Sequence, residues 1–183
     1  MEFQSLGDFD DFKKQSQGRQ KFIYDGQVIY EWEQTLEDVL IYIKTPEVLL
    51  EKNKEIVRKN LKVGQKMPKL EVEFKCDNLK IQISGADPYI NEKLTSKVRN
   101  SECLWEIDGE EIIITLPKAL KGETWKSVFI GHGNLNELQL EEVKKKMLKE
   151  RFQEEHGGFD FSDANISGNV PDPKNFLGGL KYG

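Results

Sequence analysis

Hydrophobic and polar residues alternate with a period of two along most of the chain from residue 28 onward. Val28, Tyr30 and Trp32 share one face of the first such segment, and glutamates occupy the other face. The pair Asp108-Gly109 lies between two later segments and predicts a tight hairpin. Similar alternation recurs at residues 39–43, 70–74, 79–83, 103–107, 112–116 and 128–130. Many short strands joined by turns predict a mainly β fold, a compact antiparallel β-sandwich.

An insertion near residues 46–62 has helical character instead. Thr45 is a suitable capping residue, Pro46 suits the first turn, and Gly64 suits the end of the helix. Residues 44–69 contain eight basic and three acidic residues, a local charge of +5. We expect a helix that rides on the sandwich with its charges on a solvated face. Contact with an acidic partner or with anionic lipid is the alternative.

A second helix is predicted over residues 134–156. Asn134 and Glu137 fit a helix-capping pair, and Gly157 and Gly158 end the helix. We expect it to cover the sandwich, and the alternative is that it pairs with a second copy of the chain in a homodimer. Apolar residues recur along one of its faces at helical spacing: Leu140, Val143, Met147, Leu148 and Phe152.

The two ends of the chain lack a pattern that predicts a folded core. Residues 1–26 mix charged residues and glutamines with scattered phenylalanines, so we expect a flexible N-terminal arm before a domain at 27–133. Residues 157–183 are rich in glycine and contain the motif GFDFS. So short a segment cannot bury Phe159 and Phe161 alone. We expect a flexible tail whose phenylalanines dock on the domain or on a partner.

Composition and charge exclude several classes of protein. The 183 residues carry a net charge of −5, with a charged fraction of 32%, so we expect a modest core and no general affinity for nucleic acid. The chain begins with neither a basic segment nor an apolar run, so no secretory signal is expected. No apolar stretch is long enough to span a membrane. These features predict a cytoplasmic protein with no membrane partner.

Residues that could carry out catalysis or hold a metal are scarce. The chain has two histidines, His132 and His156, and two cysteines, Cys76 and Cys103, too few and too far apart for an ordinary zinc site. A nucleophilic pair of Cys103 and His132 is an alternative, but Cys103 occupies a strand position where we expect a core residue. No nucleotide-binding loop is present. We therefore predict no catalytic activity, no metal and no cofactor.

The tryptophans are candidates for either the core or a binding surface. Trp105 is in phase with Cys103 and Ile107, so we expect it in the core. Trp32 begins an edge-like strand after polar residues, and core packing and partner contact remain equally open for it.

Several motifs resemble those of the NudC family of CS-domain proteins. Residues 30–39, YEWEQTLEDV, resemble the opening of the family's domain, and residues 103–107 and 112–118, with Trp125, resemble its closing strands. Residues 148–168, with the elements ERFQ, GFDFS and ISG, resemble a C-terminal signature found in the family. The resemblance covers about residues 28–130 and this tail. It implies an antiparallel sandwich of about seven or eight strands.

The resemblance also implies a function. Members of the family are non-enzymatic co-chaperones that assist heat-shock protein 90, bind client proteins and support cytoplasmic dynein through its lissencephaly-type regulator. The alternative is a chaperone-independent adaptor of the dynein and microtubule machinery, and either role implies a cytoplasmic protein, with microtubule or centrosome association as a further expectation. The partner-binding residues that we predict on this basis are Trp32, Gln34, Lys118, Trp125, Phe159 and Phe161.

Overall fold

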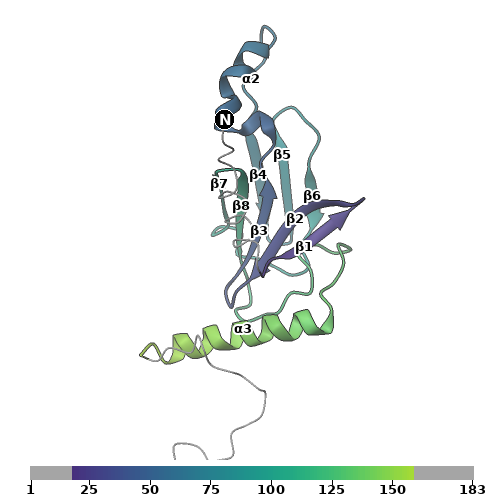
Figure 1. Cartoon of the computed structure of the whole chain (residues 1–183). Coiled ribbons are helices and arrows are strands. Elements are labelled where there is room, and N and C mark those ends of the chain that lie inside the picture. Colours follow the sequence, from purple (N-terminus) through teal and green to yellow (C-terminus); the bar gives the residue numbers. More distant parts are fainter. Residues whose placement is uncertain (1–17, 159–183) are drawn as a thin grey trace, which may run out of the picture.

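The computed structural model describes residues 18–158, which form two antiparallel β-sheets packed face to face (Figure 1). This arrangement confirms the predicted mainly β sandwich. The larger sheet has five strands in the order β1 (Gln20–Tyr24), β2 (Gln27–Gln34), β3 (Asp38–Lys44), β8 (Glu111–Pro117) and β7 (Leu104–Asp108). The smaller sheet contains β4 (Leu70–Lys75), β5 (Asn78–Ile83) and β6 (Ile90–Lys93).

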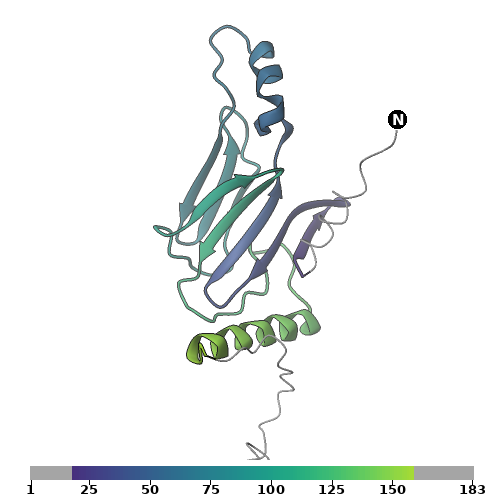
Figure 2. The same ribbon diagram turned by 60° about the vertical axis from the view of Figure 1, so that its left-hand side comes forward.

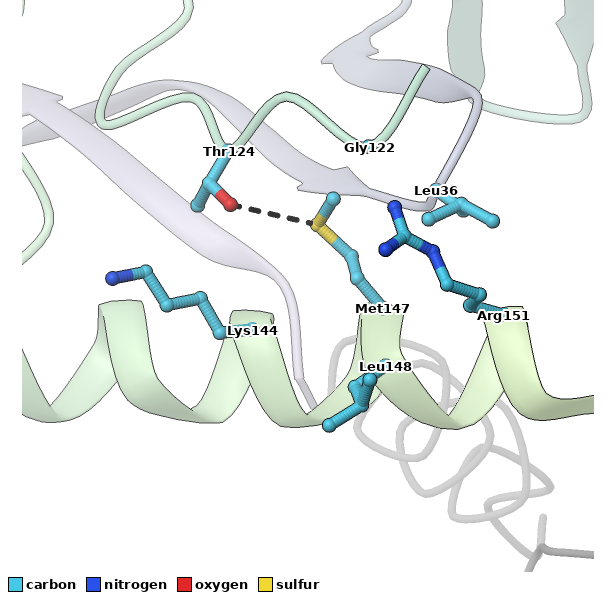
Figure 3. A pocket seen from close by; sticks show the side chains of 7 residues that line it. All are labelled: Leu36, Gly122, Thr124, Lys144, Met147, Leu148 and Arg151. Carbon is cyan, nitrogen blue, oxygen red and sulfur yellow. Dashed lines mark hydrogen bonds between the residues drawn. The ribbon is translucent and has the colours of Figure 1, made fainter. Parts of the chain in front are cut away.

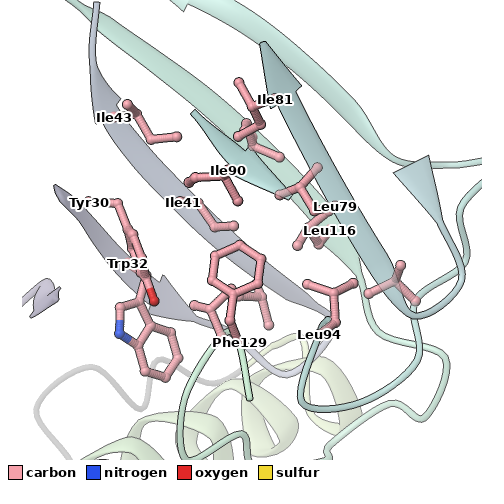
Figure 4. Packing of buried hydrophobic residues seen from close by; sticks show 14 of the residues in the cluster. Tyr30, Trp32, Ile41, Ile43, Leu79, Ile81, Ile90, Leu94, Leu116 and Phe129 are labelled. Atoms are coloured by element: carbon pink, nitrogen blue, oxygen red, sulfur yellow. The ribbon is translucent and has the colours of Figure 1, made fainter. Parts of the chain in front are cut away.

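The core lies between the two sheets, and the alternation of the strands explains which residues fill it (Figure 4). Each fully buried side chain of this kind contributes roughly 2 kcal/mol of hydrophobic stabilisation. The predicted last strand at 128–130 is reduced to an isolated bridge between Leu94 and Phe129, yet Val128 remains buried. Alternate residues of the central strands are at most 3% exposed: Val39, Ile41, Ile43, Leu79, Ile81, Ile112, Ile114 and Leu116.

The end of the predicted N-terminal arm is folded. Gln20–Tyr24 form β1, which joins β2 through the turn Asp25-Gly26, where both residues have positive φ as a tight hairpin requires. Arg19 anchors the start of β1 because its guanidinium lies 3.0 Å from the Glu111 carboxylate. The flexible-arm prediction is therefore wrong from residue 18 onward, because the backbone of β1 pairs with β2 and Phe22 packs against the core. Residues 1–17 lie outside the described part of the chain.

β7 is an edge strand of the larger sheet, and its residues are more exposed than those of the neighbouring strand β8. Trp105 pairs with Ile114 and Ile107 pairs with Ile112, so both β7 side chains lie on the inner face of the sheet. They are nevertheless 37% and 41% exposed. The prediction that Trp105 packs in the core is therefore wrong. The phase was correct, because Trp105 lies opposite the buried Ile114, but β7 is the edge strand of its sheet and its inner face remains partly accessible.

The insertion is not one continuous helix. It contains two 3₁₀ turns, η1 (Glu47–Leu49) and η2 (Glu51–Asn53), followed by the short helix α2 (Lys54–Asn60). Leu50 interrupts the helix because its extended backbone lets the side chain reach the core, where it is 6% exposed. Thr45 does not act as a cap, and its buried hydroxyl has no hydrogen-bond partner among residues 18–158. α2 projects from one end of the sandwich instead of riding on it (Figures 1 and 2).

The predicted C-terminal helix is α3 (Glu137–Glu155), which lies across the other end of the sandwich (Figure 2). Its cap is Asn136, two residues later than the predicted Asn134. The Asn136 side chain accepts a hydrogen bond from the Gln139 backbone N–H, and the Gln139 side chain accepts one from the Asn136 N–H, each at 2.9 Å. α3 thus closes one end of the sandwich.

Candidate protein-binding site

Four residues that were predicted to face a partner are buried. Trp32 is 4% exposed, Gln34 2%, Lys118 0% and Trp125 1%. Side chains with so little accessible surface cannot anchor a partner in this state, so that prediction is wrong for all four. The family resemblance was the basis of that prediction. For Gln34, the phase it shares with Tyr30 and Trp32 on β2 was a signal that already placed it inward.

Gln34, Lys118 and Trp125 form what we call the buried polar cluster. The Gln34 side-chain amide donates to the Trp125 backbone carbonyl at 2.7 Å and accepts from the Trp125 N–H at 2.8 Å. Lys118 Nζ donates to Gln34 Oε1 at 3.1 Å, to the Thr35 carbonyl at 2.6 Å and to the Glu123 carbonyl at 2.8 Å. All three ammonium hydrogens therefore have acceptors. The cluster joins the end of β2 to β8 and to the loop that follows β8.

Burial lowers the pKa of Lys118 to about 8, against the opposing effect of the nearby carboxylates of Glu123, Glu150 and Asp38. Desolvation is the cause, because a buried ammonium loses its water shell. The three carbonyl acceptors replace much of that lost solvation. Lys118 is thus a structural cation within the fold.

One accessible apolar surface lies at the edge formed by β7. Trp105 and Ile107 line a groove of about 500 Å³ together with Leu70 of β4, and we call it the β7 groove. Its other walls come from the insertion and from the segment that enters β4. The remaining lining residues are Leu49, Glu51, Lys54, Pro68, Lys69 and Gly109.

The β7 groove offers backbone groups as well as apolar side chains. Only β8 pairs with β7 among the described strands, so alternate N–H and C=O groups of β7 face away from the sheet. Lys54 and Lys69 lie on the wall opposite β7, and Glu106 and Asp108 lie along β7 itself. An extended peptide could add a strand here, with apolar side chains against Trp105 and Ile107 and charged groups at the rim.

A smaller hollow of about 140 Å³ lies where α3 meets the loops of the sandwich (Figure 3). Met147 points from α3 toward Thr124 and is 4% exposed. The Leu36 backbone N–H donates to Glu150 Oε2 at 2.6 Å, which holds the helix against the β2–β3 turn. Lys121 adds ion pairs to Glu37 and Glu154, each at 2.7 Å. These contacts hold α3 against the sandwich, so this surface is occupied by the chain's own helix.

The groups that could carry out chemistry are dispersed. Burial raises the pKa of the Cys103 thiol to about 11, which suppresses the thiolate that a nucleophile needs. Cys103 Sγ lies 3.6 Å from the Arg99 carbonyl, whereas His132 bonds to Tyr30, so the two residues have different partners. Within residues 18–158 no group of three potential ligands could hold a metal ion. No helix in this part of the chain is long and apolar enough to cross a membrane.

Phe159 and Phe161, the last two predicted binding residues, lie outside the described residues. Their role in partner binding stays a prediction.

Comparison with known proteins gives a consistent set of relatives. A family model described as the CS domain matches residues 28–118, from β2 to the residue after β8. NudC domain-containing protein 2 from Homo sapiens is 25% identical over 142 residues, which cover 76% of this chain and 80% of that protein. Protein BOBBER 1 from Arabidopsis thaliana is 22% identical over 174 residues, covering 75% of this chain and 52% of the relative. The chain thus spans about half the length of this plant protein.

Two further matches concern a fission-yeast protein and a solved structure. The nuclear movement protein nudc of Schizosaccharomyces pombe is 28% identical over 121 residues, which cover 64% of this chain and 63% of that protein. The crystal structure of NudC domain-containing protein 2 from Mus musculus has a TM-score of 0.35 at 18% identity, covering 79% of this chain and 97% of that one.

Proposed function

The chain belongs to the CS-domain proteins of the NudC family, and from that membership we propose that it is a co-chaperone-like protein-binding module without catalytic activity. The observation that supports a binding role is the β7 groove, where inward-facing Trp105 and Ile107 remain accessible at an unpaired strand edge. Apolar surface next to free backbone groups suits the capture of extended, incompletely folded segments.

The finer proposal concerns the partners. On the basis of the family resemblance, we propose heat-shock protein 90, its client proteins and a lissencephaly-type regulator of dynein, in the cytoplasm and near microtubules or centrosomes. The second candidate is an adaptor of the dynein machinery that works without the chaperone. The name of the fission-yeast relative, nuclear movement protein, favours that candidate.

The β7 groove is tested by the double substitution Trp105→Thr with Ile107→Thr. Threonine keeps the β-propensity of the edge strand but removes most of the apolar contact surface. We expect the variant to need about tenfold more protein than the wild type to suppress aggregation of a heat-denatured reporter enzyme, since the loss of about 1.4 kcal/mol of binding free energy is tenfold in affinity. Light scattering at several protein concentrations measures this ratio.

The matched control is Val63→Thr, because Val63 is fully exposed and lies outside the β7 groove. This variant should suppress aggregation as well as the wild type does. Thermal unfolding of both variants checks that the sandwich is intact. Equal protection by the groove variant and the wild type, with unchanged thermal midpoints, would rule out the β7 groove as the client site.

The C-terminal motif gives a separate prediction. Phe159→Ala with Phe161→Ala should weaken capture of partners while leaving the thermal midpoint nearly unchanged, because we propose that the two rings contact a partner. Affinity capture from cytosol, paired with thermal unfolding, measures both quantities. A midpoint that falls by several degrees would instead assign the two rings to packing within the chain.

The two candidate functions are distinguished by affinity capture with heat-shock protein 90 inhibited. A co-chaperone should lose the dynein regulator from the captured fraction, whereas an independent adaptor should retain it. Capture of neither partner by the full chain would reject both partner assignments and leave only a general role in binding unfolded segments.

A further inference from the structure

The open edge of β7 presents the backbone groups of two particular residues. The turn between β7 and β8 has two residues, so the first pair of the hairpin, Asp108 with Glu111, is hydrogen-bonded. Hydrogen-bonded pairs recur at every second position of an antiparallel ladder. The N–H and C=O groups of Trp105 and Ile107 therefore point away from β8, and no other segment among residues 18–158 bonds to them. These are the groups that an added strand would use.

A strand added to this edge would have two faces in different surroundings. Its residues opposite Trp105 and Ile107 would point into the β7 groove, because side chains directly across a strand pair share one face. Its intervening residues would lie on the outer face of the larger sheet, beside Glu106 and Asp108. The residue types that suit each face can therefore be derived separately.

The outer face of β7 is acidic. Glu106 and Asp108 are exposed, lie two residues apart on the same face, and form no ion pair with another described residue. Glu111, which lies across the hairpin from Asp108, is already paired with Arg19. Opposite charges directly across a strand pair are stabilising and like charges are destabilising. Basic side chains on the outer face of an added strand would therefore be favoured.

The β7 groove favours apolar side chains and disfavours basic ones. Apolar side chains outnumber charged ones in its lining, and its charged residues are Glu51, Lys54 and Lys69. Lys54 already pairs with Glu51, whereas Lys69 has no ion pair among the described residues. A lysine that pointed into the groove would meet this positive charge and lose solvation among apolar side chains. The two faces thus select different residue types.

We propose that the β7 edge selects extended segments in which apolar and basic residues alternate. The apolar side chains enter the groove against Trp105 and Ile107, and the basic side chains pair with Glu106 and Asp108 on the outer face. This proposal rests on the proposed function, since it takes the β7 groove as the binding site and names the class of segment that the site selects. The net charge of −5 attracts any basic segment, so the test must separate local from overall attraction.

The test compares two peptides, acetyl-TVKVKVT-amide and acetyl-TVEVEVT-amide, each titrated into the full chain labelled with ¹⁵N. We expect the lysine peptide to shift the backbone amide cross-peaks of Trp105 and Ile107. It should bind about tenfold more tightly than the glutamate peptide, because two cross-strand pairs change from opposite to like charge. Glu106→Lys with Asp108→Lys should reverse this preference. The milder double variant Glu106→Gln with Asp108→Asn should abolish most of it.

Glu141→Lys with Glu142→Lys is the matched control, since it makes the same change of net charge at two exposed positions of α3. This variant should keep most of the preference for the lysine peptide, because distant surface charges are largely screened. Circular dichroism checks that each variant is folded. Equal loss of the preference in the β7 variants and in the α3 variant would assign it to net charge and overturn the proposal.

The failure of this proposal can be distinguished from the failure of the proposed function. Equal affinities of the wild type for the two peptides, with the amides of Trp105 and Ile107 shifted by both, would overturn the charge selection and leave the β7 groove as the binding site. Unshifted amides of Trp105 and Ile107 with both peptides would overturn the charge selection and the groove together.

Discussion

Replacing Lys118 with methionine should lower the free energy of unfolding by about 3 kcal/mol. Methionine has a similar length and fills the space, so the loss comes from hydrogen bonds and not from a cavity. The carbonyls of Thr35 and Glu123 would lose the ammonium donor, and Gln34 Oε1 would keep only the Trp125 N–H. Buried acceptors without a donor cost about 1 to 3 kcal/mol each before relaxation.

Urea unfolding, followed by tryptophan fluorescence and by circular dichroism, measures this loss. Lys121→Met is the control, because Lys121 is an exposed lysine in the neighbouring loop whose ion pairs with Glu37 and Glu154 lie at the surface. It should cost less than about 1 kcal/mol. Equal losses for the two variants would contradict the structural role of the Lys118 ammonium.

The difference in stability between the wild type and Lys118→Met should depend on pH. The pKa of Lys118 falls from 10.5 to about 8 on folding, so between these values the unfolded chain binds more protons than the native chain. Stability therefore rises with pH in this window. The free energy of unfolding of the wild type minus that of Lys118→Met isolates this effect from the effects of other titrating groups. We expect the difference to grow by no more than about 3 kcal/mol from pH 8 to pH 10.5, since the carbonyl acceptors favour the charged form.

Met147→Ala should release α3 from the end of the sandwich without unfolding the two sheets. Met147 is the buried residue of this helix, and its contact with Thr124 lies at the centre of the docking surface (Figure 3). Removing its side chain should lower the free energy of docking by about 2 kcal/mol, at the lower end for buried methionines because the site lies near solvent. Hydrogen exchange should then be roughly 30-fold faster for α3 amides.

Amides of β3 and β8 should keep their protection in this variant, since those strands form the core of the larger sheet. Leu138→Ala is the control within the same helix, because Leu138 is 73% exposed. It should leave α3 protection nearly unchanged. Equal loss of protection in α3 and in the central strands of Met147→Ala would show that the helix is part of one cooperative unit with the sandwich.

The sequence predicted most of the strands, and it also predicted α3. Period-two alternation is a local property, so Ile41 and Ile114 were recognisable as inward-facing residues without knowledge of their neighbours. The insertion was predicted less well. Leu50 interrupts the helical pattern of the insertion and is buried. Its burial depends on neighbours that are distant in the sequence.

The candidate sites were predicted poorly. Gln34 and Lys118 have side chains that are usually exposed, and they are buried here because loop carbonyls and the Trp125 backbone satisfy them. Trp105 has a side chain that is usually buried, and it is accessible here because β7 is the edge strand of its sheet. Neither the acceptors nor the position of β7 at the edge of the sheet is encoded near these residues in the chain.

The sequence by itself thus determined most inward-facing residues of the predicted strands, the turn between β7 and β8, and the family to which the motifs point. Only the tertiary structure decided which inward faces are covered, and therefore which side chains are free to contact another protein. The physical reason is that alternation follows from the geometry of a single strand, whereas burial depends on contacts with segments distant in sequence.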